Sequence, residues 1–140
     1  MQKRKALIVG VSGGVGSYGI QFAKAFHPEN TAVAICSGRY AKFVKSLGAD
    51  VVIDYTDKTA FEEFLKQEKG TFDYIFDCVG GDAYLKKLDP LLKKLGVYSI
   101  AAGPIEHIGS ENVGLFSIAS ALYTIVRIKL FSPHTYKLIL

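Results

Sequence analysis

Short apolar runs alternate along the chain with longer stretches of helical periodicity. Each run is continuously apolar, which is the pattern of a strand covered on both faces. Glycine, proline and polar residues bound these runs and mark the turns between elements. The expected strands are Ala6–Val9, Thr31–Cys36, Val51–Ile53, Phe72–Val79 and Gly96–Ala101.

The segments between these strands place apolar residues three and four positions apart, as one face of a helix requires. The tail from Gly114 to about Leu130 is also predicted to be helical, within a largely helical C-terminal extension over residues 104–140. The expected helices before that tail are Tyr18–Phe26, Tyr40–Leu47, Lys58–Lys69 and Asp82–Leu95, the last of them despite Pro90 inside it.

Regular alternation of strand and helix is the signature of βαβ units and a parallel sheet. Right-handed crossovers then give a doubly wound sheet whose ligand crevice lies at the carboxyl ends of the strands. A length of 140 residues fits one domain. We therefore predict a single α/β domain of the Rossmann type over residues 1–140.

A glycine-rich turn, GVSGGVGS at residues 10–17, joins the first expected strand to the first helix. Glycine lets the backbone approach a phosphate closely, and the N–H groups at a helix start favour negative charge. By spacing, Gly13 is the close-approach glycine and Gly16 the packing glycine, while Ser12 and Ser17 offer hydroxyls. Val11 stands where GxGxxG has its first glycine, so the motif is partial, but its place between strand and helix supports dinucleotide binding.

The same turn also fits the glycine spacing of a second dehydrogenase family. Gly10, Gly14 and Gly16 spell GxxxGxG, the spacing of short-chain dehydrogenases, which carry a catalytic Tyr-xxx-Lys. Here Tyr123 is followed four places on by Arg127, which makes that family the weaker alternative. A Walker loop is excluded because no Gly-Lys-Ser/Thr follows. A glycine turn that binds nothing is the remaining alternative.

The segment after the second strand indicates which dinucleotide is bound. An NAD site places an acid about 20 residues after the glycines to hold the ribose 2′-hydroxyl. Here Ser37, Gly38, Arg39 and Tyr40 follow the strand, and no acid occurs until Asp50. A hydroxyl and a guanidinium suit a 2′-phosphate. NADPH is therefore predicted in preference to NADH, against the alternative that Arg39 is merely solvent-exposed.

Composition changes this picture little. The chain is 49% hydrophobic with a formal net charge of +4, which fits a compact core. Lys86, Lys87, Lys93 and Lys94 are expected on one helix as a solvated face, so no nucleic-acid partner is predicted. The uncharged stretch 113–126 falls short of the ~20 residues of a membrane span, so membrane association is not expected.

Side chains that could carry metal or acid–base chemistry are few. Cys36 and Cys78 end apolar runs and are expected to be buried thiols of an intracellular protein. No spacing of Cys and His indicates a metal site. Asp54 and Asp77 follow strands and are expected to cap local turns or bond ribose hydroxyls. No residue of this chain is predicted to be catalytic.

Three runs together resemble the medium-chain dehydrogenase/reductase superfamily, and within it the zinc-independent quinone oxidoreductase and reticulon-4-interacting-protein-like branch. The likeness covers roughly residues 5–103. The runs that carry it are GVSGGVGSYGIQFAKAF, KSLGADVVIDY and FDYIFDCVGG.

The resemblance implies a role for particular residues of this chain. Ser12, Gly14 and Val15 match the loop on the pyrophosphate, beside Gly13 and Gly16. Ser37 matches a serine on the 2′-phosphate, and Arg39 or Tyr40 falls where a basic residue often assists. Further matches are implied for the adenosine phosphate at Tyr55, the nicotinamide ribose at Val79 and Gly80, and the nicotinamide itself at Ala102 and Gly103.

Such enzymes normally carry an N-terminal, GroES-like substrate domain before this region. The resemblance covers only the cofactor-binding region, so that substrate domain is expected to be absent from this chain. The implied function is hydride transfer from NADPH to a quinone or an α,β-unsaturated carbonyl within a longer protein. A non-catalytic NADPH-binding module, acting in redox sensing or protein interaction, is the alternative. The compartment is expected to be cytoplasmic or mitochondrial. The apolar tail would pack against the missing domain or against a second copy in a homodimer, and both remain open.

Overall fold

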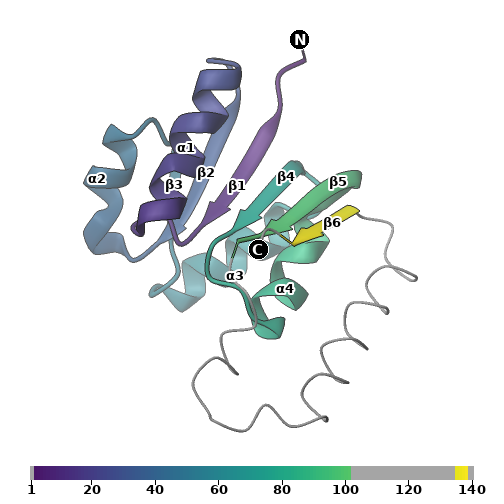
Figure 1. The fold of residues 1–140 in the computed structure, drawn as a ribbon. Helices are drawn as coiled ribbons and strands as arrows, with labels where there is room; N and C mark the ends of the chain where they lie inside the picture. The colour runs from purple at the N-terminus through teal and green to yellow at the C-terminus, as the bar shows by residue number, and fades with distance from the viewer. Residues whose placement is uncertain (1, 102–134, 139–140) are drawn as a thin grey trace, which may run out of the picture.

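The computed structural model describes residues 2–101 and 135–138 (Figure 1). Its centre is a six-stranded sheet in the order β3-β2-β1-β4-β5-β6, and every neighbouring pair is parallel. The strands are β1 Lys5–Val9, β2 Thr31–Cys36, β3 Val51–Asp54, β4 Phe72–Asp77, β5 Leu92–Ile100 and β6 Thr135–Leu138.

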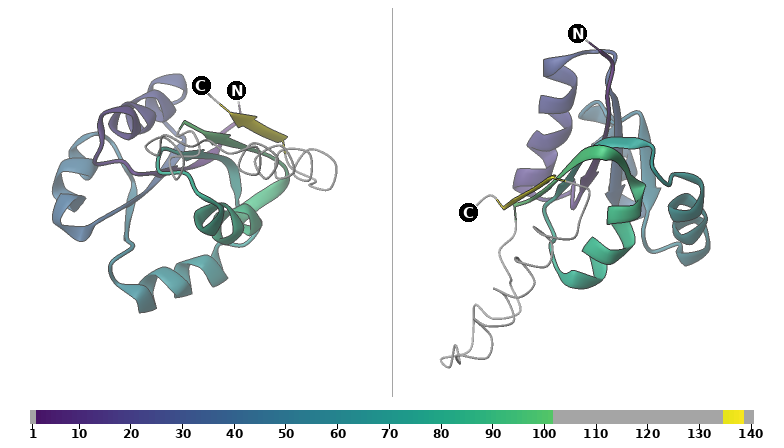
Figure 2. Two further views of the ribbon diagram at one scale, coloured as in Figure 1. Left: turned by 60° about the horizontal axis from the view of Figure 1, so that its bottom comes forward. Right: turned by 90° about the vertical axis from the view of Figure 1, so that its right-hand side faces the viewer.

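Helices cover the two faces of this sheet, because parallel strands need crossover connections (Figure 2). A 3-10 turn at Gly38–Tyr40 leads into α2, and another at Asp89–Leu91 follows α4. The helices are α1 Gly14–Phe26, α2 Ala41–Ser46, α3 Lys58–Gln67 and α4 Asp82–Leu88.

The core consists of two layers, one on each side of the sheet. Side chains alternate across a strand, so Ala6 and Ile8 of β1 face α1 and α2, whereas Leu7 and Val9 face α3 and α4. Ile20 of α1 is fully buried against the first face. The continuous apolar runs of the sequence therefore form strands buried on both sides, and the predicted Rossmann-type α/β fold is confirmed.

The predicted helix over Asp82–Leu95 was wrong beyond Leu88. Pro90 has no N–H and would clash with the preceding turn, so the helix gives way to a 3-10 turn around it. Leu92 then starts β5 by pairing with Phe72 across an irregularity in the register. Lys93 and Lys94 consequently lie on a strand and do not share a helix face with the other predicted pair of lysines.

Other differences include the start of α1 and an additional strand. α1 begins at Gly14 rather than Tyr18, so the second half of the glycine turn forms the first turn of the helix. β6 was not predicted; it pairs with β5 from Val97↔Thr135 to Ile100↔Leu138. The helix predicted from Gly114 to about Leu130 lies outside the described residues.

Ion pairs gather at the amino ends of the strands. Lys5 at the start of β1 pairs with Glu68 beyond α3 at 2.5 Å. Lys93 of β5 pairs with Asp73 of β4 at 2.7 Å. Lys24 near the end of α1 reaches Asp50, just before β3, also at 2.7 Å. These contacts join helix ends and strand starts at the edge opposite the expected ligand crevice.

The close packing of α1 against the turn after β1 depends on Gly16. A Cβ placed on Gly16 would lie 2.3 Å from the Gly10 carbonyl oxygen, which belongs to backbone and has no room to move. At Gly14, two residues earlier, a Cβ would meet nothing within 4 Å. The packing role predicted for Gly16 therefore has a direct steric basis.

Gly16→Ala is expected to lower the free energy of unfolding by about 1–3 kcal/mol or to prevent folding, because of this overlap. The matched variant Gly14→Ala should be neutral or stabilise by up to about 1 kcal/mol, since alanine favours helix. Urea unfolding followed by circular dichroism measures both. Equal stability of the two variants would contradict the packing role of Gly16.

Candidate dinucleotide site at the carboxyl edge

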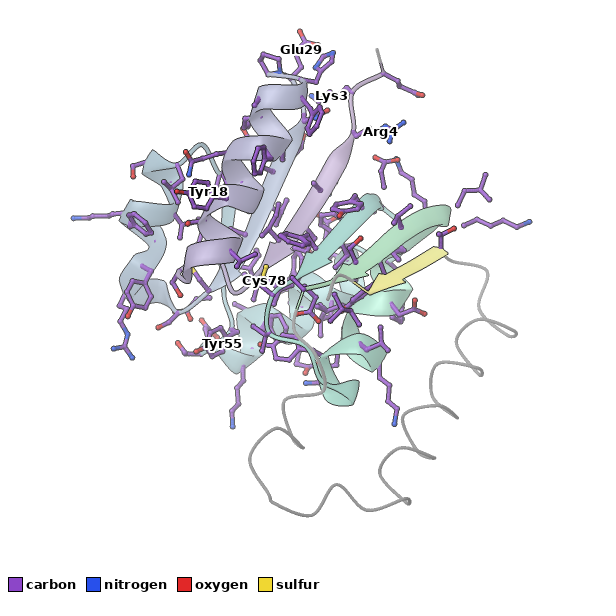
Figure 3. All side chains as sticks on the ribbon, in the orientation of Figure 1. Lys3, Arg4, Tyr18, Glu29, Tyr55 and Cys78 are labelled. Carbon is purple, nitrogen blue, oxygen red and sulfur yellow. The ribbon has the colours of Figure 1, made fainter. Side chains whose placement is uncertain are left out.

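The carboxyl ends of the parallel strands lie at one edge of the sheet. From β1 the chain continues to β2 on one side, and from β4 it continues to β5 on the other side, so the strand order switches between β1 and β4. Such a switch point is where open α/β sheets bind ligands. Figure 3 shows Tyr55 and Cys78 at this edge, at the opposite end of the molecule from Lys3 and Glu29. The turns that follow β1, β2, β3 and β4 therefore form one continuous border.

The N-terminus of α1 presents unused hydrogen-bond donors to this border. Gly13 caps the helix without a side-chain hydrogen bond, and the first turn contains no acidic residue. Within the described part of the chain, the N–H groups of Gly14, Val15 and Gly16 have no acceptor. The segment from Ser12 to Val15 is exposed. This arrangement of free N–H groups at the end of a 13-residue helix fits a pyrophosphate.

The segment after β2 carries an exposed cation, Arg39. Arg39 is exposed, and no Asp or Glu of the described residues lies within 4.0 Å of it. Its Nε makes a long 3.5 Å contact with the Ser37 hydroxyl, and its guanidinium lies 5.6 Å from the centre of the Tyr40 ring. The structure thus brings a hydroxyl and a guanidinium together, as a 2′-phosphate would require.

The end of β3 adds Tyr55 and a carboxylate to the same place. The Tyr55 N–H donates to the Cys36 carbonyl, which fixes the turn beside β2, and the Tyr55 ring is half exposed. Asp54 accepts hydrogen bonds from the side chain and the backbone N–H of Thr56 at 2.7 and 2.9 Å. These bonds hold the pKa of the Asp54 carboxyl below its usual range. The predicted turn-capping role of Asp54 is confirmed.

A buried carboxylate organises the turn after β4. Asp77 is fully buried, and its Oδ1 accepts from the N–H groups of Val79 and Gly80, both at 2.9 Å. Its Oδ2 accepts from the hydroxyl of Tyr98, a fully buried residue of β5. Asp77 therefore caps this turn as predicted, and all of these partners are internal to the fold.

Cys78 lies between that carboxylate and the exposed Val79 side chain. Burial, assisted by the negative charge of Asp77, raises the pKa of the Cys78 thiol to about 11. Cys36 is buried in β2, where burial and the charge of Asp54 also raise its thiol pKa. Neither thiol is in the thiolate form that nucleophilic or redox chemistry needs at neutral pH.

Most of the predicted site residues come together at this border. The close approach of Asp54 to the turn after β2 was missed, although the glycine two places after that strand was a signal for it. Ala102 and Gly103 lie outside the described residues. The predicted residues found along the carboxyl edge are Ser12, Gly13, Gly14, Val15, Gly16, Ser37, Arg39, Tyr40, Tyr55, Val79 and Gly80.

Comparison with known proteins relates the chain to a family of oxidoreductases. Residues 14–138 match the family model described as zinc-binding dehydrogenase. The chain is 47% identical over 93 residues to the mitochondrial NAD(P)H oxidoreductase RTN4IP1 of Mus musculus, covering 66% of this chain and 22% of that protein. It is 39% identical over 105 residues to the chloroplast envelope quinone oxidoreductase homolog of Arabidopsis thaliana, covering 74% of this chain and 30% of the relative.

The solved structure of the quinone oxidoreductase from Coxiella burnetii superposes with a TM-score of 0.69 at 27% identity, covering 99% of this chain and 37% of that one. The chain thus spans between about a fifth and two fifths of the relatives named here.

Although the family model is described as zinc-binding, residues 2–101 and 135–138 contain no group of three His, Cys, Asp or Glu that could hold a metal ion. The described residues therefore do not fit a zinc site. In those same ranges no helix is long and apolar enough to cross a bilayer.

Tyr98→Phe is expected to lower the free energy of unfolding by about 1.5–3 kcal/mol, because the buried Asp77 carboxylate loses a charge-assisted hydrogen bond. Tyr74→Phe is the control, since the Tyr74 hydroxyl has no hydrogen bond within the described part of the chain; its effect should stay within about 0.5 kcal/mol. Urea unfolding compares the two, and similar losses would contradict the role of the Tyr98 hydroxyl.

Alkylation of Cys78 by iodoacetamide should accelerate about tenfold per pH unit from pH 7 to 10 without reaching a plateau, because its pKa is about 11. Mass spectrometry of the Cys78 peptide gives the rate. The same peptide in urea should level off near pH 9, the ordinary thiol value. A plateau near pH 9 in the folded chain would show that burial does not suppress the thiolate.

Proposed function

Because the chain belongs to the zinc-binding dehydrogenase family and forms the cofactor-binding domain of a medium-chain dehydrogenase/reductase, we propose that it binds NADPH for hydride transfer. The acceptor that we propose is a quinone or an α,β-unsaturated carbonyl. The observation that carries the proposal is the shared edge where the first N–H groups of α1, the Ser37 hydroxyl and Arg39 lie along one border; in the described ranges those N–H groups have no acceptor and Arg39 has no carboxylate within 4.0 Å.

Each proposed contact follows from the chemistry of the residue. The N–H groups of Gly14, Val15 and Gly16 would hold the pyrophosphate, with Gly13 leaving the backbone open to it. Ser12 would add a hydroxyl donor. These roles are supported by the exposure of the turn and by the absence of any acceptor for those donors in the described part of the chain.

The adenosine end would lie over the ends of β2 and β3. Ser37 and Arg39 would bind the 2′-phosphate through a hydroxyl and a guanidinium. The rings of Tyr40 and Tyr55 are 41% and 46% exposed, so both are accessible to a ligand at this corner. We propose that the adenosine packs between them.

The nicotinamide end would lie along the turn after β4. Bound nicotinamide supplies a hydride at its C4 position. Val79 offers an apolar side chain that is 44% exposed, and Gly80 lets the ribose approach the backbone. Because Asp77 holds both of their N–H groups, this turn is fixed before the cofactor arrives. Ala102 and Gly103 stay proposed contacts of the ring.

The groups that bind the substrate and deliver its proton are proposed to come from the rest of a longer protein. Asp54 and Asp77, the carboxylates identified at this edge, are held by backbone N–H groups of their own turns. The relatives named above extend well beyond the matched segment. This chain would therefore position the cofactor and exclude water on one side of the reaction.

Arg39→Ala is expected to weaken NADPH binding by about tenfold or more while leaving NADH nearly unchanged, since only NADPH carries the 2′-phosphate. Lys66→Ala, which removes an exposed cation near the far end of α3, is the charge-matched control and should change neither affinity. Calorimetric titration with both dinucleotides measures the constants. Preference for NADH, or no binding of either by the folded wild-type chain, would overturn the NADPH assignment.

A further inference from the structure

The carboxylate of Asp54 occupies the space beside the end of β2. The two strands pair so that Asp54 lies opposite Cys36, the last residue of β2. A Cβ placed on Gly38 would fall 2.2 Å from the Asp54 Oδ2 atom and 3.0 Å from its Cγ atom. A side chain at position 38 would require the carboxylate to shift, so glycine there lets the carboxylate lie against the turn after β2.

This carboxylate is fixed in place and charged. Thr56 holds it through its hydroxyl and its backbone N–H, and the Gly38 backbone makes a small further contribution to lowering its pKa. The same bonds lower the pKa of the carboxyl, so it is ionised at neutral pH. No Lys, Arg or His of the described residues forms an ion pair with it. Its negative charge is therefore available to a ligand at this border.

NAD-binding sites of this fold use a carboxylate at the end of the second strand to accept a hydrogen bond from the ribose 2′-hydroxyl. In this chain the second strand ends in Cys36, followed by Ser37, with no acid. The neighbouring strand brings a carboxylate to the same corner, one position across the sheet and in contact with Gly38. β3 thus supplies the carboxylate that the end of β2 lacks.

We propose that Asp54 is a specificity-determining residue. It accepts a hydrogen bond from the 2′-hydroxyl of NADH and repels the 2′-phosphate of NADPH, so that the site binds both dinucleotides. This inference rests on the proposed dinucleotide function. Ser37 and Arg39 attract the 2′-phosphate, and Asp54 limits their effect by like-charge repulsion at the same corner. The ratio of the two affinities is set by the balance of the three side chains.

The test is the ratio of the dissociation constants for NADH and NADPH, measured by calorimetry on the 140-residue chain. Asp54→Asn keeps the shape of the side chain and removes its charge. NADPH should bind more tightly and NADH more weakly, which raises the ratio about tenfold or more. Asp57→Asn is the matched control because it removes the same charge from the exposed cap of α3, where asparagine caps equally well. Its ratio should stay within about twofold of the wild-type value.

A second readout isolates the ribose position. Adenosine 2′,5′-bisphosphate and adenosine 5′-monophosphate differ only at the 2′ group, so the variant should gain affinity for the first relative to the second. Asp54→Ser, a smaller neutral replacement, should shift the ratio in the same direction and replaces the asparagine variant if that one does not fold.

The outcomes separate this inference from the proposed function. If the wild-type chain binds a dinucleotide but Asp54→Asn leaves the ratio of the NADH and NADPH dissociation constants unchanged, the role of Asp54 alone is overturned. The same follows if Asp57→Asn shifts that ratio equally. Folded wild-type chain that binds neither dinucleotide overturns both the proposed function and this inference. A raised ratio confined to the Asp54 variants supports both.

Discussion

The pairing of β1 with β2 on one side and β4 on the other is the constraint on which the rest depends. It satisfies both hydrogen-bonding edges of β1, leaves the two faces of that strand to be covered by helices, and sends the chain to opposite sides of β1 at the same end of the sheet. The first connection becomes α1, whose N-terminus must then lie at that edge. The turn after β4 arrives beside it for the same reason. The site is thus a geometric consequence of parallel pairing around one strand.

Fixed carboxylates give that edge its local shape. Asp77 ties the turn after β4 to Tyr98 of the next strand, and Asp54 caps the turn after β3 and lies against Gly38 of the turn after β2. Both accept from backbone N–H groups and from a nearby hydroxyl, so each fixes the chain without a long flexible partner. An edge built this way is ordered before any ligand binds, which reduces the entropy lost on binding.

The sequence was sufficient for the architecture because continuous apolar strands and helical spacing are strong local signals. It misplaced the start of β5, since Leu88, Leu91 and Leu92 also fit helical spacing and only the register with Phe72 reveals the strand. It placed Ser37, Arg39 and the glycine turn at the correct edge. The contact between Asp54 and Gly38 could not be predicted from the sequence, because it forms only when β2 and β3 pair. Their ligand-binding roles remain predictions.

The ion pairs at the amino ends of the strands have a consequence for how such a domain can change over time. Lys5, Lys24 and Lys93 join elements at the edge remote from the ligand border. Substitutions there adjust how firmly the layers hold together, while substitutions at the opposite edge adjust what is recognised. Because the length of the strands separates the two ends, the stability of the fold and its ligand specificity can change independently. A new ligand specificity can therefore evolve while the fold stays the same.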